Sequence, residues 1–360
     1  MKLFQPDNFS RSDIFYREIN NDSLFITIFG KYFKNSEILD IAQLNRSEVN
    51  SENFRVHAKV DGENKYFLLR RHKVLTNKKQ IDFYIELLLQ LEKQQVPVSA
   101  VIKSLDDTYS VSVENELYSL FDFIEARYFV PSEMALRSVA LSIAKMHFAL
   151  NKLDQSSADQ IKEYSKLSKV YYNVVPEYSE ADFSQIIDLI IKQESITEVE
   201  QELVDYWEVI KKLIAEVKNN QTAIDKLPQQ IIHSDLHPHN ILINDNTVRA
   251  IVDFDSVRLS QQARDVAFAI YRFGRQFFVS NKTLEKKDGV WLNKLFLDSY
   301  CQIMPLDKTA IDLLPIIIKD EFLRKILFVM RGVYLDNNID WKGDLAKFIT
   351  AFQEFKYFWP

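Results

Sequence analysis

Residues 231–255 hold most of the side chains in this sequence that could do chemistry. Two apolar runs, 241–243 and 249–252, flank a turn at 244–246, and this pattern predicts a β-hairpin. Because the two ends of a hairpin meet while its tip points away, the polar residues on either side should lie together. These residues are His233, Asp235, His237 and Asn240 before the hairpin, and Asp253 and Asp255 after it. We therefore expect a group of carboxylates and one amide in which a metal ion and a phosphate could sit.

The spacing of these residues matches the needs of phosphoryl transfer from ATP. That reaction needs one carboxylate to receive the proton of the attacking hydroxyl, and oxygen ligands for the magnesium ion that bridges the phosphates. Magnesium prefers a few hard protein oxygens, which Asn240 and Asp253 would supply. Protein kinases have the same H-x-D-x-x-x-x-N spacing followed by an Asp-Phe dipeptide, but here Asp255 stands in place of their glycine.

Composition limits the class of protein. With 45 basic and 51 acidic residues the net charge is -6, and no long basic block is present, so nucleic acid is not an expected partner. No apolar run approaches the length of a membrane span, and the N-terminus lacks the apolar core of a signal peptide. The single cysteine, Cys301, fits a reducing compartment, so we expect a cytoplasmic protein. The six glycines form neither a dinucleotide-binding motif nor a Walker-type phosphate loop. The sequence does not indicate an oligomeric state.

The first third of the chain predicts a mostly antiparallel sheet. Residues 54–60 and 65–71 have the composition of strands, and Asp61-Gly62 between them is a strong hairpin signal. Apolar residues at helical spacing predict helices at 22–34 and 78–94. Further strands are expected at 100–103, 109–113 and 116–123.

After residue 131 the apolar spacing becomes helical. Helices are expected at 132–150, 180–192, 197–219, 264–278, 291–303, 308–336 and 341–355. The predicted fold class is therefore α+β, with a small N-terminal sheet lobe, residues 1–124, and a larger, mainly helical lobe, residues 125–360. A cleft between two such lobes is a common place for a small-molecule site.

Residues 231–255 resemble the catalytic loop of the aminoglycoside phosphotransferase and choline kinase-like superfamily. Members of that superfamily carry H-x-D-L-H-x-x-N followed by I-D-F/W-x-D. The resemblance is closest to the branch that holds type II homoserine kinases and a bacterial stress-response kinase. It covers roughly residues 36–275 in the order of the family. Four further segments carry it: Ser51-Glu52-Asn53, Phe67-Leu68-Leu69-Arg70, Leu120-Phe121-Asp122-Phe123-Ile124 and Ala263-Arg264-Asp265-Val266-Ala267.

The resemblance implies a two-lobe protein-kinase-like fold, ATP and Mg²⁺ as cofactors, and a role for each matching residue in the catalytic loop. Asp235 would be the catalytic base, and His233 would orient the loop. Asn240 and Asp253 would bind magnesium. Asp255 would be either a further acidic ligand of the metal or a group that supports these ligands.

The resemblance also implies a nucleotide site in the N-terminal lobe. Arg70 would hold the α- and β-phosphates. Ser51 and Asn53 would belong to the turn that covers the nucleotide, and the hinge residues Phe121, Asp122 and Phe123 would pair with adenine through their backbone. Asp265 would brace the catalytic loop.

Three positions depart from the family pattern. His239 stands where the family usually has glycine. Tyr84 falls where a helix glutamate would pair with Arg70, so Asp82 or Glu86 would have to replace it, or the pair is absent. Arginine in place of lysine at position 70 keeps the charge and adds a bidentate fork.

Other functions stay open at this stage. His233, His237 and His239 with an aspartate could form a zinc site, although Pro238 and the short spacing point neighbouring imidazoles apart. The unfilled glutamate position motivates a second hypothesis, a nucleotide-binding pseudokinase that acts through protein contacts. A serine/threonine protein kinase is a third. The main prediction is an ATP-dependent kinase that phosphorylates a hydroxyl of a small molecule, such as an amino alcohol like homoserine, an amino sugar or an aminoglycoside-like acceptor. His147, on an apolar helix face, is predicted to be a packed core histidine.

Overall fold

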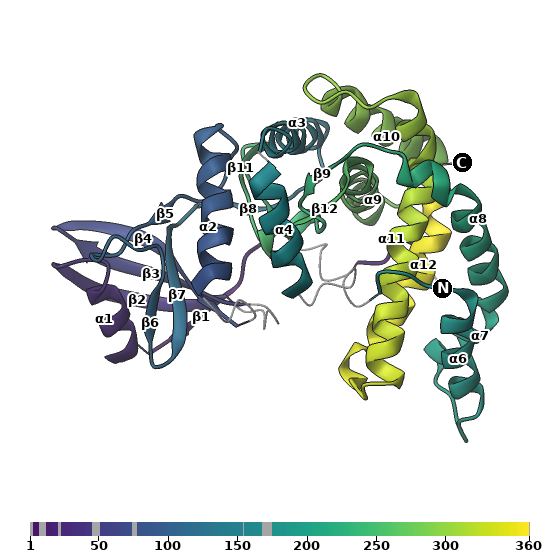
Figure 1. The fold of residues 1–360 in the computed structure, drawn as a ribbon, viewed down its shortest axis with the longest axis horizontal. Helices are drawn as coiled ribbons and strands as arrows, with labels where there is room; N and C mark the ends of the chain where they lie inside the picture. The colour runs from purple at the N-terminus through teal and green to yellow at the C-terminus, as the bar shows by residue number, and fades with distance from the viewer. Residues whose placement is uncertain are drawn as a thin grey trace.

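The chain folds into two lobes with the predicted α+β composition (Figure 1). The structure is a computed structural model, and it describes residues 3–6, 12–20, 23–44, 51–73, 78–153, 155–167 and 175–359. The strands of the N-terminal lobe gather at one end of the molecule, and helices build most of the other end. None of the helices in the described part of the chain combines the length and the apolar character that a bilayer crossing requires.

The N-terminal lobe is a seven-stranded antiparallel sheet with the order β1-β2-β3-β4-β7-β5, and β6 pairs with β7 off this path. Its apolar face packs with the short helix α1 in a core of its own. The strands are β1 (Tyr16–Ile19), β2 (Ser36–Leu44), β3 (Ser51–Val60), β4 (Glu63–His72), β5 (Val101–Ile102), β6 (Val111–Val113) and β7 (Glu116–Asp122), and α1 is Ser23–Gly30.

Strands β3 and β4 form the predicted hairpin. Asp61 and Gly62 both have positive φ, 47° and 89°, which is the backbone that a two-residue turn of this kind requires. The hairpin holds β4 in the middle of the sheet, where most residues in the half away from the turn are buried between β3 and β7. Arg70 and His72 near the end of β4 are therefore almost fully buried.

Helix α2 (Lys78–Lys93) belongs to the core of the second lobe, although it follows the sheet in sequence. In Figure 1 it stands between the sheet and the helices. Its buried face carries Tyr84, Leu87, Leu88 and Leu91, at the spacing that predicted the helix.

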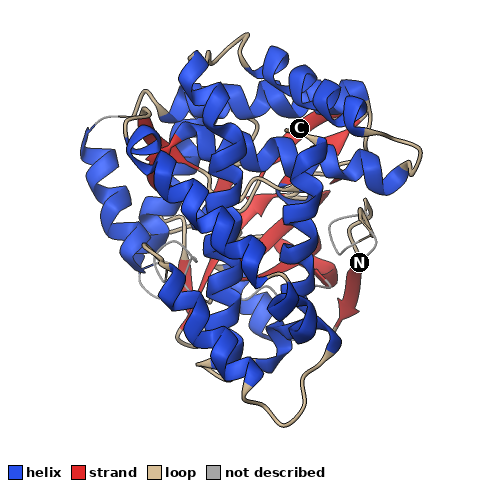
Figure 2. Cartoon of the chain, turned by 90° about the vertical axis from the view of Figure 1, so that its right-hand side faces the viewer, coloured by secondary structure: helices blue, strands red, loops and turns tan. Residues whose placement is uncertain are grey.

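The C-terminal lobe consists of helices around three short strand pairs (Figure 2). Strand β10 pairs with both β8 and β11, and β9 pairs with β12, all of them antiparallel. The strands are β8 (Arg127–Tyr128), β9 (Gln229–Ile232), β10 (Ile241–Asn244), β11 (Thr247–Ile251) and β12 (Arg258–Gln261). The helices are α3 (Glu133–Leu150), α4 (Gln155–Leu167), α6 (Glu180–Ile191), α7 (Glu198–Asp205), α8 (Trp207–Asp225), α9 (Gln262–Ser280), α10 (Lys286–Tyr300), α11 (Lys308–Tyr334) and α12 (Leu345–Glu354).

One expectation about the helices was wrong, and one helix was missed. The single helix predicted at 197–219 is divided at Tyr206 into α7 and α8. The two aromatic residues at the division pack in different directions, since Tyr206 stacks on Phe352 and Trp207 stacks on Phe183. Helix α4 was not predicted, because its sequence is mostly polar and only a few apolar residues, among them Ile161 and Tyr164, mark its buried side.

The buried His72 makes the stability of the sheet depend on pH. Burial, and then the neighbouring charge of Arg70, lower the pKa of the His72 imidazole to about 3. The unfolded chain binds a proton on this residue below about pH 6.5, whereas the folded chain stays neutral, so stability is lost as the pH falls through this window. We expect this residue alone to lower the free energy of unfolding by about 2 kcal/mol between neutral pH and about pH 5.

Urea unfolding of the variant His72→Gln at both pH values measures this effect, because the variant should lose about 2 kcal/mol less than the unchanged protein. The matched control is His57→Gln on the neighbouring strand β3, where the imidazole is only partly buried and lies 2.8 Å from Asp40. An unchanged pH dependence in His72→Gln would contradict the prediction.

Candidate active site

The predicted hairpin is present, and it brings the two polar clusters together. Strands β10 and β11 pair antiparallel, with a shift of register between Leu242 and Ile243, and both turn residues, Asp245 and Asn246, have positive φ. The backbone N–H of Val252 donates to the carbonyl of Asn240 at 3.0 Å, which closes the base of the hairpin. The loop that precedes the hairpin, residues 233–240, therefore lies beside the turn that follows it, residues 252–257.

The tip of the hairpin is fixed to helix α3. Ser132, the N-cap of α3, accepts from Ala135 N at 3.1 Å and donates to Asn246 Oδ1 at 2.7 Å. Ser138 accepts from the N–H of Val248 at 3.0 Å. At its base, the N–H of Ile251 donates to the carbonyl of Pro97, just after α2, at 2.8 Å.

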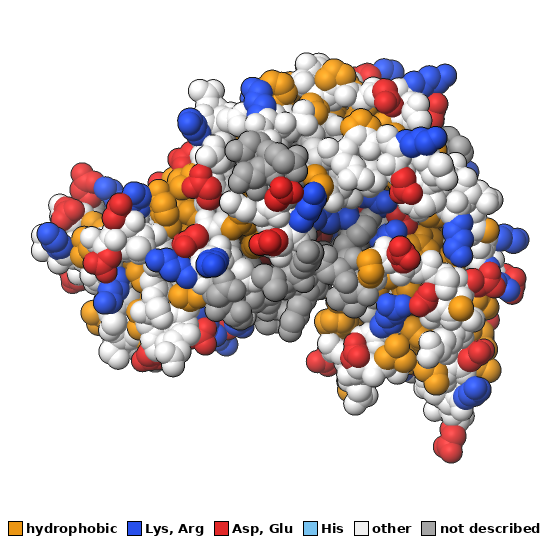
Figure 3. Space-filling view, viewed as in Figure 1, with side chains coloured by type: hydrophobic (Ala, Val, Ile, Leu, Met, Phe, Trp, Pro, Cys, Tyr) orange, Lys and Arg blue, Asp and Glu red, His pale blue; other side chains and the backbone are white. Residues whose placement is uncertain are grey.

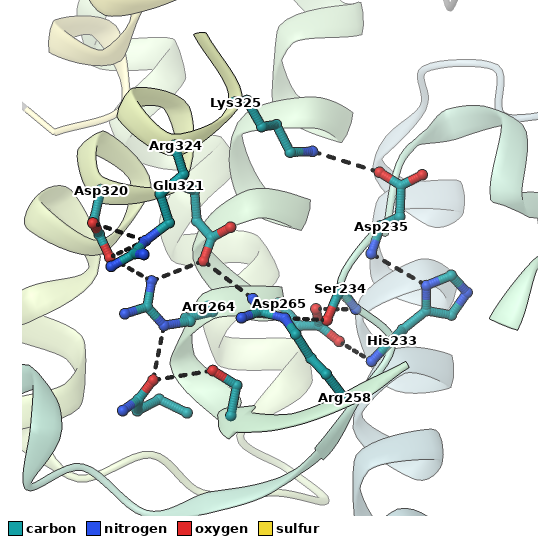
Figure 4. A network of polar contacts seen from close by, with 12 residues as sticks. His233, Ser234, Asp235, Arg258, Arg264, Asp265, Asp320, Glu321, Arg324 and Lys325 are labelled. Carbon is teal, nitrogen blue, oxygen red and sulfur yellow. Dashed lines mark hydrogen bonds and ion pairs between the residues drawn. The ribbon is translucent and has the colours of Figure 1, made fainter. Parts of the chain in front are cut away.

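Asp265 in the first turn of α9 holds the start of the 233–240 loop (Figure 4). Its carboxylate accepts from the backbone N–H groups of His233 and Ser234, both at 2.8 Å. Ser234 has a φ of 70°, so this bracing fixes a backbone conformation that L-residues rarely adopt. His147 also contacts the carboxylate, with Nε2 3.1 Å from Oδ2, and it is fully buried as predicted for a core histidine.

We expect Asp265→Asn to loosen the loop. An amide offers one acceptor oxygen and turns an NH2 group toward backbone donors, which should cost about 1–3 kcal/mol in the free energy of unfolding. Displacement of the loop should lower the turnover number about 10- to 100-fold. Asp288→Asn is the matched control, because Asp288 also lies in a first helical turn and accepts one backbone N–H, from Glu285 at 2.7 Å. Turnover equal to that of the control would show that the brace has no effect on the site.

His233 lies fully buried inside the loop, where both ring nitrogens are used. Its Nε2 lies 3.0 Å from the carbonyl of Val252, so this nitrogen carries the proton, since a carbonyl only accepts. Its Nδ1 then accepts from the N–H of Asp235 at 3.3 Å. The neutral ring thus ties the backbone of Asp235 to the residue before Asp253, which is the geometry expected of a group that orients the loop.

The Asp235 side chain reaches the edge of a cavity between two basic groups. Its Oδ2 lies 3.3 Å from His237 Nε2, and its Oδ1 lies 3.5 Å from Nζ of Lys325 on α11. Burial raises the pKa of the Asp235 carboxyl, but His237 and Lys325 lower it further, so that its pKa lies well below the ordinary value. The group is therefore a carboxylate at neutral pH and can accept a proton.

Asn240 and Asp253 meet the chemical requirements of a magnesium site. The Asn240 amide nitrogen donates to the backbone carbonyl of Asp235 at 2.9 Å, which fixes the orientation of the amide and its oxygen. Asp253 directly follows Val252, the partner of Asn240, and has left-handed backbone with φ 66° and ψ 60°. One amide oxygen and one partly exposed carboxylate are hard ligands of the kind that magnesium takes alongside water and phosphate.

Arg70 of the N-terminal lobe reaches across to the turn after the hairpin. Its Nη2 lies 2.5 Å from Asp255 Oδ2 and 3.5 Å from Asp253 Oδ1. The guanidinium also lies over the ring of Tyr84, 5.4 Å from the centroid. Asp255 was predicted as a possible metal ligand, but in the structure its carboxylate pairs with Arg70. It thus supplies the carboxylate that Tyr84, at the position of the family's helix glutamate, cannot supply.

The predicted nucleotide segments lie in the N-terminal lobe, but one of them differs from expectation. Ser51 and Asn53 were predicted to lie in a turn, whereas they already belong to strand β3, where they face His72 and Arg70 in the register with β4. Full backbone pairing with β4 holds this segment as strand. The turn itself would fall on residues 45–50, which lie outside the described residues.

The predicted hinge, residues 121–123, lies at the end of β7, where its first two residues are still part of the strand. Phe121 is buried, and Asp122 ends β7 with its N–H donating to Ala100 O at 2.9 Å. Phe123 follows, and its ring lies 5.9 Å from that of Tyr66.

The three histidines of the zinc alternative have different surroundings. His233 faces Val252, His237 faces Asp235, and the ring of His239 packs on Tyr128 at 4.1 Å. Within the described residues there is no group of three or more His, Cys, Asp or Glu that could hold a metal ion. His239, the departure from the family glycine, is thus buried against β8.

The sequence did not reveal Lys325 and Arg272 as candidate site residues. Both line the cavity next to Asp235, but they come from α11 and α9, far along the chain. No local spacing connects them with the 233–240 loop. Only the fact that each interrupts a largely apolar helix face could have pointed to them.

The chain is similar to proteins of known activity. Residues 41–280, two thirds of the chain, match the phosphotransferase enzyme family. A homoserine kinase from Zymomonas mobilis subsp. mobilis is 21% identical over 207 residues, so the match spans 56% of this chain and 56% of the length of that relative.

Two solved structures share the fold over almost the full chain. The aminoglycoside phosphotransferase from Alicyclobacillus acidocaldarius superposes with a TM-score of 0.62 at 12% identity, over 94% of this chain and 96% of that one. Spectinomycin phosphotransferase in complex with ADP and spectinomycin gives a TM-score of 0.63 at 15% identity, over 93% and 92%. These likenesses confirm the predicted two-lobe kinase-like fold.

Proposed function

The chain belongs to the phosphotransferase enzyme family, and on this premise we propose that it transfers the terminal phosphoryl group of ATP to a hydroxyl of a small molecule. The observation that supports this best is the placement of Asp235. Its carboxylate lies at the edge of a cavity of about 350 Å³, and its own backbone carbonyl accepts from Asn240. An acceptor in the cavity and a phosphate near Asn240 and Asp253 would thus meet at Asp235.

Asp235 would act as the general base. His237 and Lys325 keep its pKa low, so the carboxylate is ready to take the proton of the acceptor hydroxyl as that oxygen attacks phosphorus. Its role is mainly to orient the hydroxyl, since phosphoryl transfer depends more on positioning and charge than on strong base catalysis. His233 and Asp265 would hold the loop at the correct distance.

Magnesium would be held by Asn240 and Asp253. Asp255 would not bind the ion directly but would pair with Arg70. When bound, the ion neutralises charge on the phosphates during transfer. Arg70 would hold the α- and β-phosphates with its bidentate fork. Ser51 and Asn53 would line the covering strand, and the backbone after Phe121 and Asp122, from Phe123 onward, would meet the adenine. Spectinomycin phosphotransferase, which shares this fold, was solved in complex with ADP, and this supports a nucleotide as a ligand of the present chain.

The contacts of Arg70 also bear on the pseudokinase alternative. That hypothesis came from the missing glutamate at Tyr84, and the ion pair with Asp255 supplies a carboxylate to Arg70 by another route. We therefore favour an active kinase. A cytoplasmic location stays a prediction from the sequence.

The test is ATP consumption by the full chain with and without Mg²⁺, across a panel of hydroxylated metabolites. ADP formation that requires both Mg²⁺ and an acceptor supports the proposal. Nucleotide binding without turnover on any member of a broad panel of small alcohols would overturn it in favour of the pseudokinase. Incorporation of phosphate into protein serine or threonine would instead point to a protein kinase.

A further inference from the structure

The cavity next to Asp235 shows what kind of acceptor would fit. This inference rests on the proposed function, because it takes Asp235 as the group that meets the acceptor hydroxyl. The cavity lies between the 233–240 loop, α9, α11 and the start of α12. Its volume of about 350 Å³ is near the lower end of the range for small-molecule sites, so it suits a compact molecule.

The cavity wall carries more cationic than anionic side chains. Four cationic side chains line it, Arg272, Arg275, Lys325 and Lys347, against the carboxylates Asp235 and Asp344. Glu354 lies behind Arg275 at 2.8 Å, and Asp344 lies 2.5 Å from Lys347. Lys325 in turn lies 3.5 Å from Asp235, so three of the four cations have a carboxylate partner and the cations exceed the carboxylates by one. This excess of positive charge suits an anionic acceptor better than a polycationic one such as an amino sugar.

Lys325 and Arg272 are the cations that face the reacting end of the cavity. Nζ of Lys325 lies 3.5 Å from Asp235 and 3.8 Å from the centroid of Phe268. The guanidinium of Arg272 lies 6.0 Å from the centroid of the same ring. Both charges therefore lie next to the same aromatic ring.

Few water molecules can screen these charges. The Lys325 side chain is only 15% exposed, and burial lowers its pKa, with Arg272 acting in the same direction while Asp235 opposes it. At such a buried position the attraction of an anionic ligand is stronger than at the open surface. On the face drawn in Figure 3, by contrast, acidic and basic side chains are mixed over both lobes.

We propose that the acceptor carries an anionic group of its own, a carboxylate or a phosphate, which binds Arg272 and Lys325 while its hydroxyl faces Asp235. The hydroxyl oxygen forms a bond to the γ-phosphorus of ATP, the bond from that phosphorus to the β–γ bridging oxygen breaks, and ADP leaves. The hydroxyl proton passes to Asp235. The product is a phosphate ester that keeps the original anionic group.

The test uses four-carbon alcohols that differ only at the far end. Gamma-hydroxybutyrate carries a carboxylate, hydroxybutyl phosphate a phosphate, butanediol a neutral hydroxyl and aminobutanol an ammonium group. With ATP and Mg²⁺, we expect kcat/KM for one of the anionic alcohols to exceed that for butanediol about tenfold or more. Aminobutanol should be the poorest acceptor. The better of the two anionic alcohols identifies the preferred anion.

Matched variants locate the binding group. Arg272→Met should lower kcat/KM for the anionic alcohol about tenfold and leave that for butanediol within about twofold. Lys325 also lowers the pKa of Asp235, so Lys325→Met should lower kcat/KM for every acceptor, with the larger loss for the anionic alcohol, and Lys325→Arg should restore most of the preference. Lys319→Met is the control, since Lys319 lies on the same helix and pairs with Glu216 at 2.6 Å on its outer side. If Lys325→Met fails to fold, Arg272→Met carries the test alone.

Preference for butanediol or aminobutanol over both anionic alcohols would overturn the inference while the proposed function stands. Equal losses on all acceptors in Arg272→Met would do the same. If no alcohol of the set is phosphorylated, calorimetry with gamma-hydroxybutyrate and hydroxybutyl phosphate decides. Binding that Arg272→Met weakens supports the anionic site even if the phosphotransferase proposal fails. No binding of either anion, under conditions where the protein binds ATP, overturns the inference.

Discussion

Replacement of Asp235 by asparagine is expected to lower kcat by roughly a thousandfold, which corresponds to about 4 kcal/mol of the activation barrier. The amide has the same shape but cannot take the hydroxyl proton, and it ends the attraction between the carboxylate and Lys325. The backbone contacts of the loop to His233, Asn240 and Asp265 do not involve this side chain, so the fold should remain. ATP turnover with the best acceptor measures the loss.

The melting temperature and the circular dichroism of Asp235→Asn show whether the variant is folded. Asp298→Asn is the control, since Asp298 is an exposed carboxylate that pairs with Lys294 at 2.5 Å on α10. The control should keep full activity. Turnover of Asp235→Asn within about tenfold of the unchanged protein would rule out Asp235 as the catalytic base.

Asp253→Asn should produce the second largest effect. It removes the anionic ligand of the proposed magnesium site, so we expect the Mg²⁺ concentration at half-maximal rate to rise about tenfold or more, and kcat to fall about a hundredfold at fixed Mg²⁺. Initial rates over a Mg²⁺ titration at constant ATP measure both quantities.

Asp255→Asn is the matched comparison, because this carboxylate lies two residues away in the same turn but contacts Arg70. Its loss should raise the KM for ATP more than it changes the Mg²⁺ requirement. A shift in Mg²⁺ dependence as large as that of Asp253→Asn would show that Asp255 is also a metal ligand, as the sequence first suggested. An unchanged Mg²⁺ dependence in Asp253→Asn would exclude Asp253 as a ligand.

The hairpin and its polar ends could be predicted because their signals are local. The turn at Asp245 and Asn246 and the apolar runs beside it determine which residues of the two strands face each other. Hydrogen bonds between the adjacent strands then hold the polar residues at the two ends together. The hairpin at Asp61 and Gly62 was predictable for the same reason, as were the helices with a clear apolar stripe. Local patterns therefore identified the fold class and the 233–240 loop.

Contacts between distant segments could not be predicted in the same way. The pairing of β9 with β12 joins residues 229–232 to 258–261 across the whole loop and hairpin, and neither strand is long enough to show alternation. Lys325 reaches Asp235 only because α11 packs beside α9. The partner of Arg70 was sought on α2, whereas it is Asp255, 185 residues away. Such pairings depend on tertiary packing, which a single sequence does not encode in any short motif.

The attachment of the hairpin tip to Ser132 and Ser138 of α3 has a mechanical consequence. Asn240 and Asp253 lie at the base of a hairpin that is fixed at its far end, so they should move with α3 as one rigid body. Arg70 is carried by the sheet, and Pro97, which accepts from Ile251, lies in the segment that joins α2 to strand β5 of that sheet, where a pivot between the two bodies would fall. A rotation about that pivot would change the distance from Arg70 to Asp255 and leave Asn240 and Asp253 at constant separation. The enzyme could thus open and close around a nucleotide while the geometry of its metal ligands stays the same.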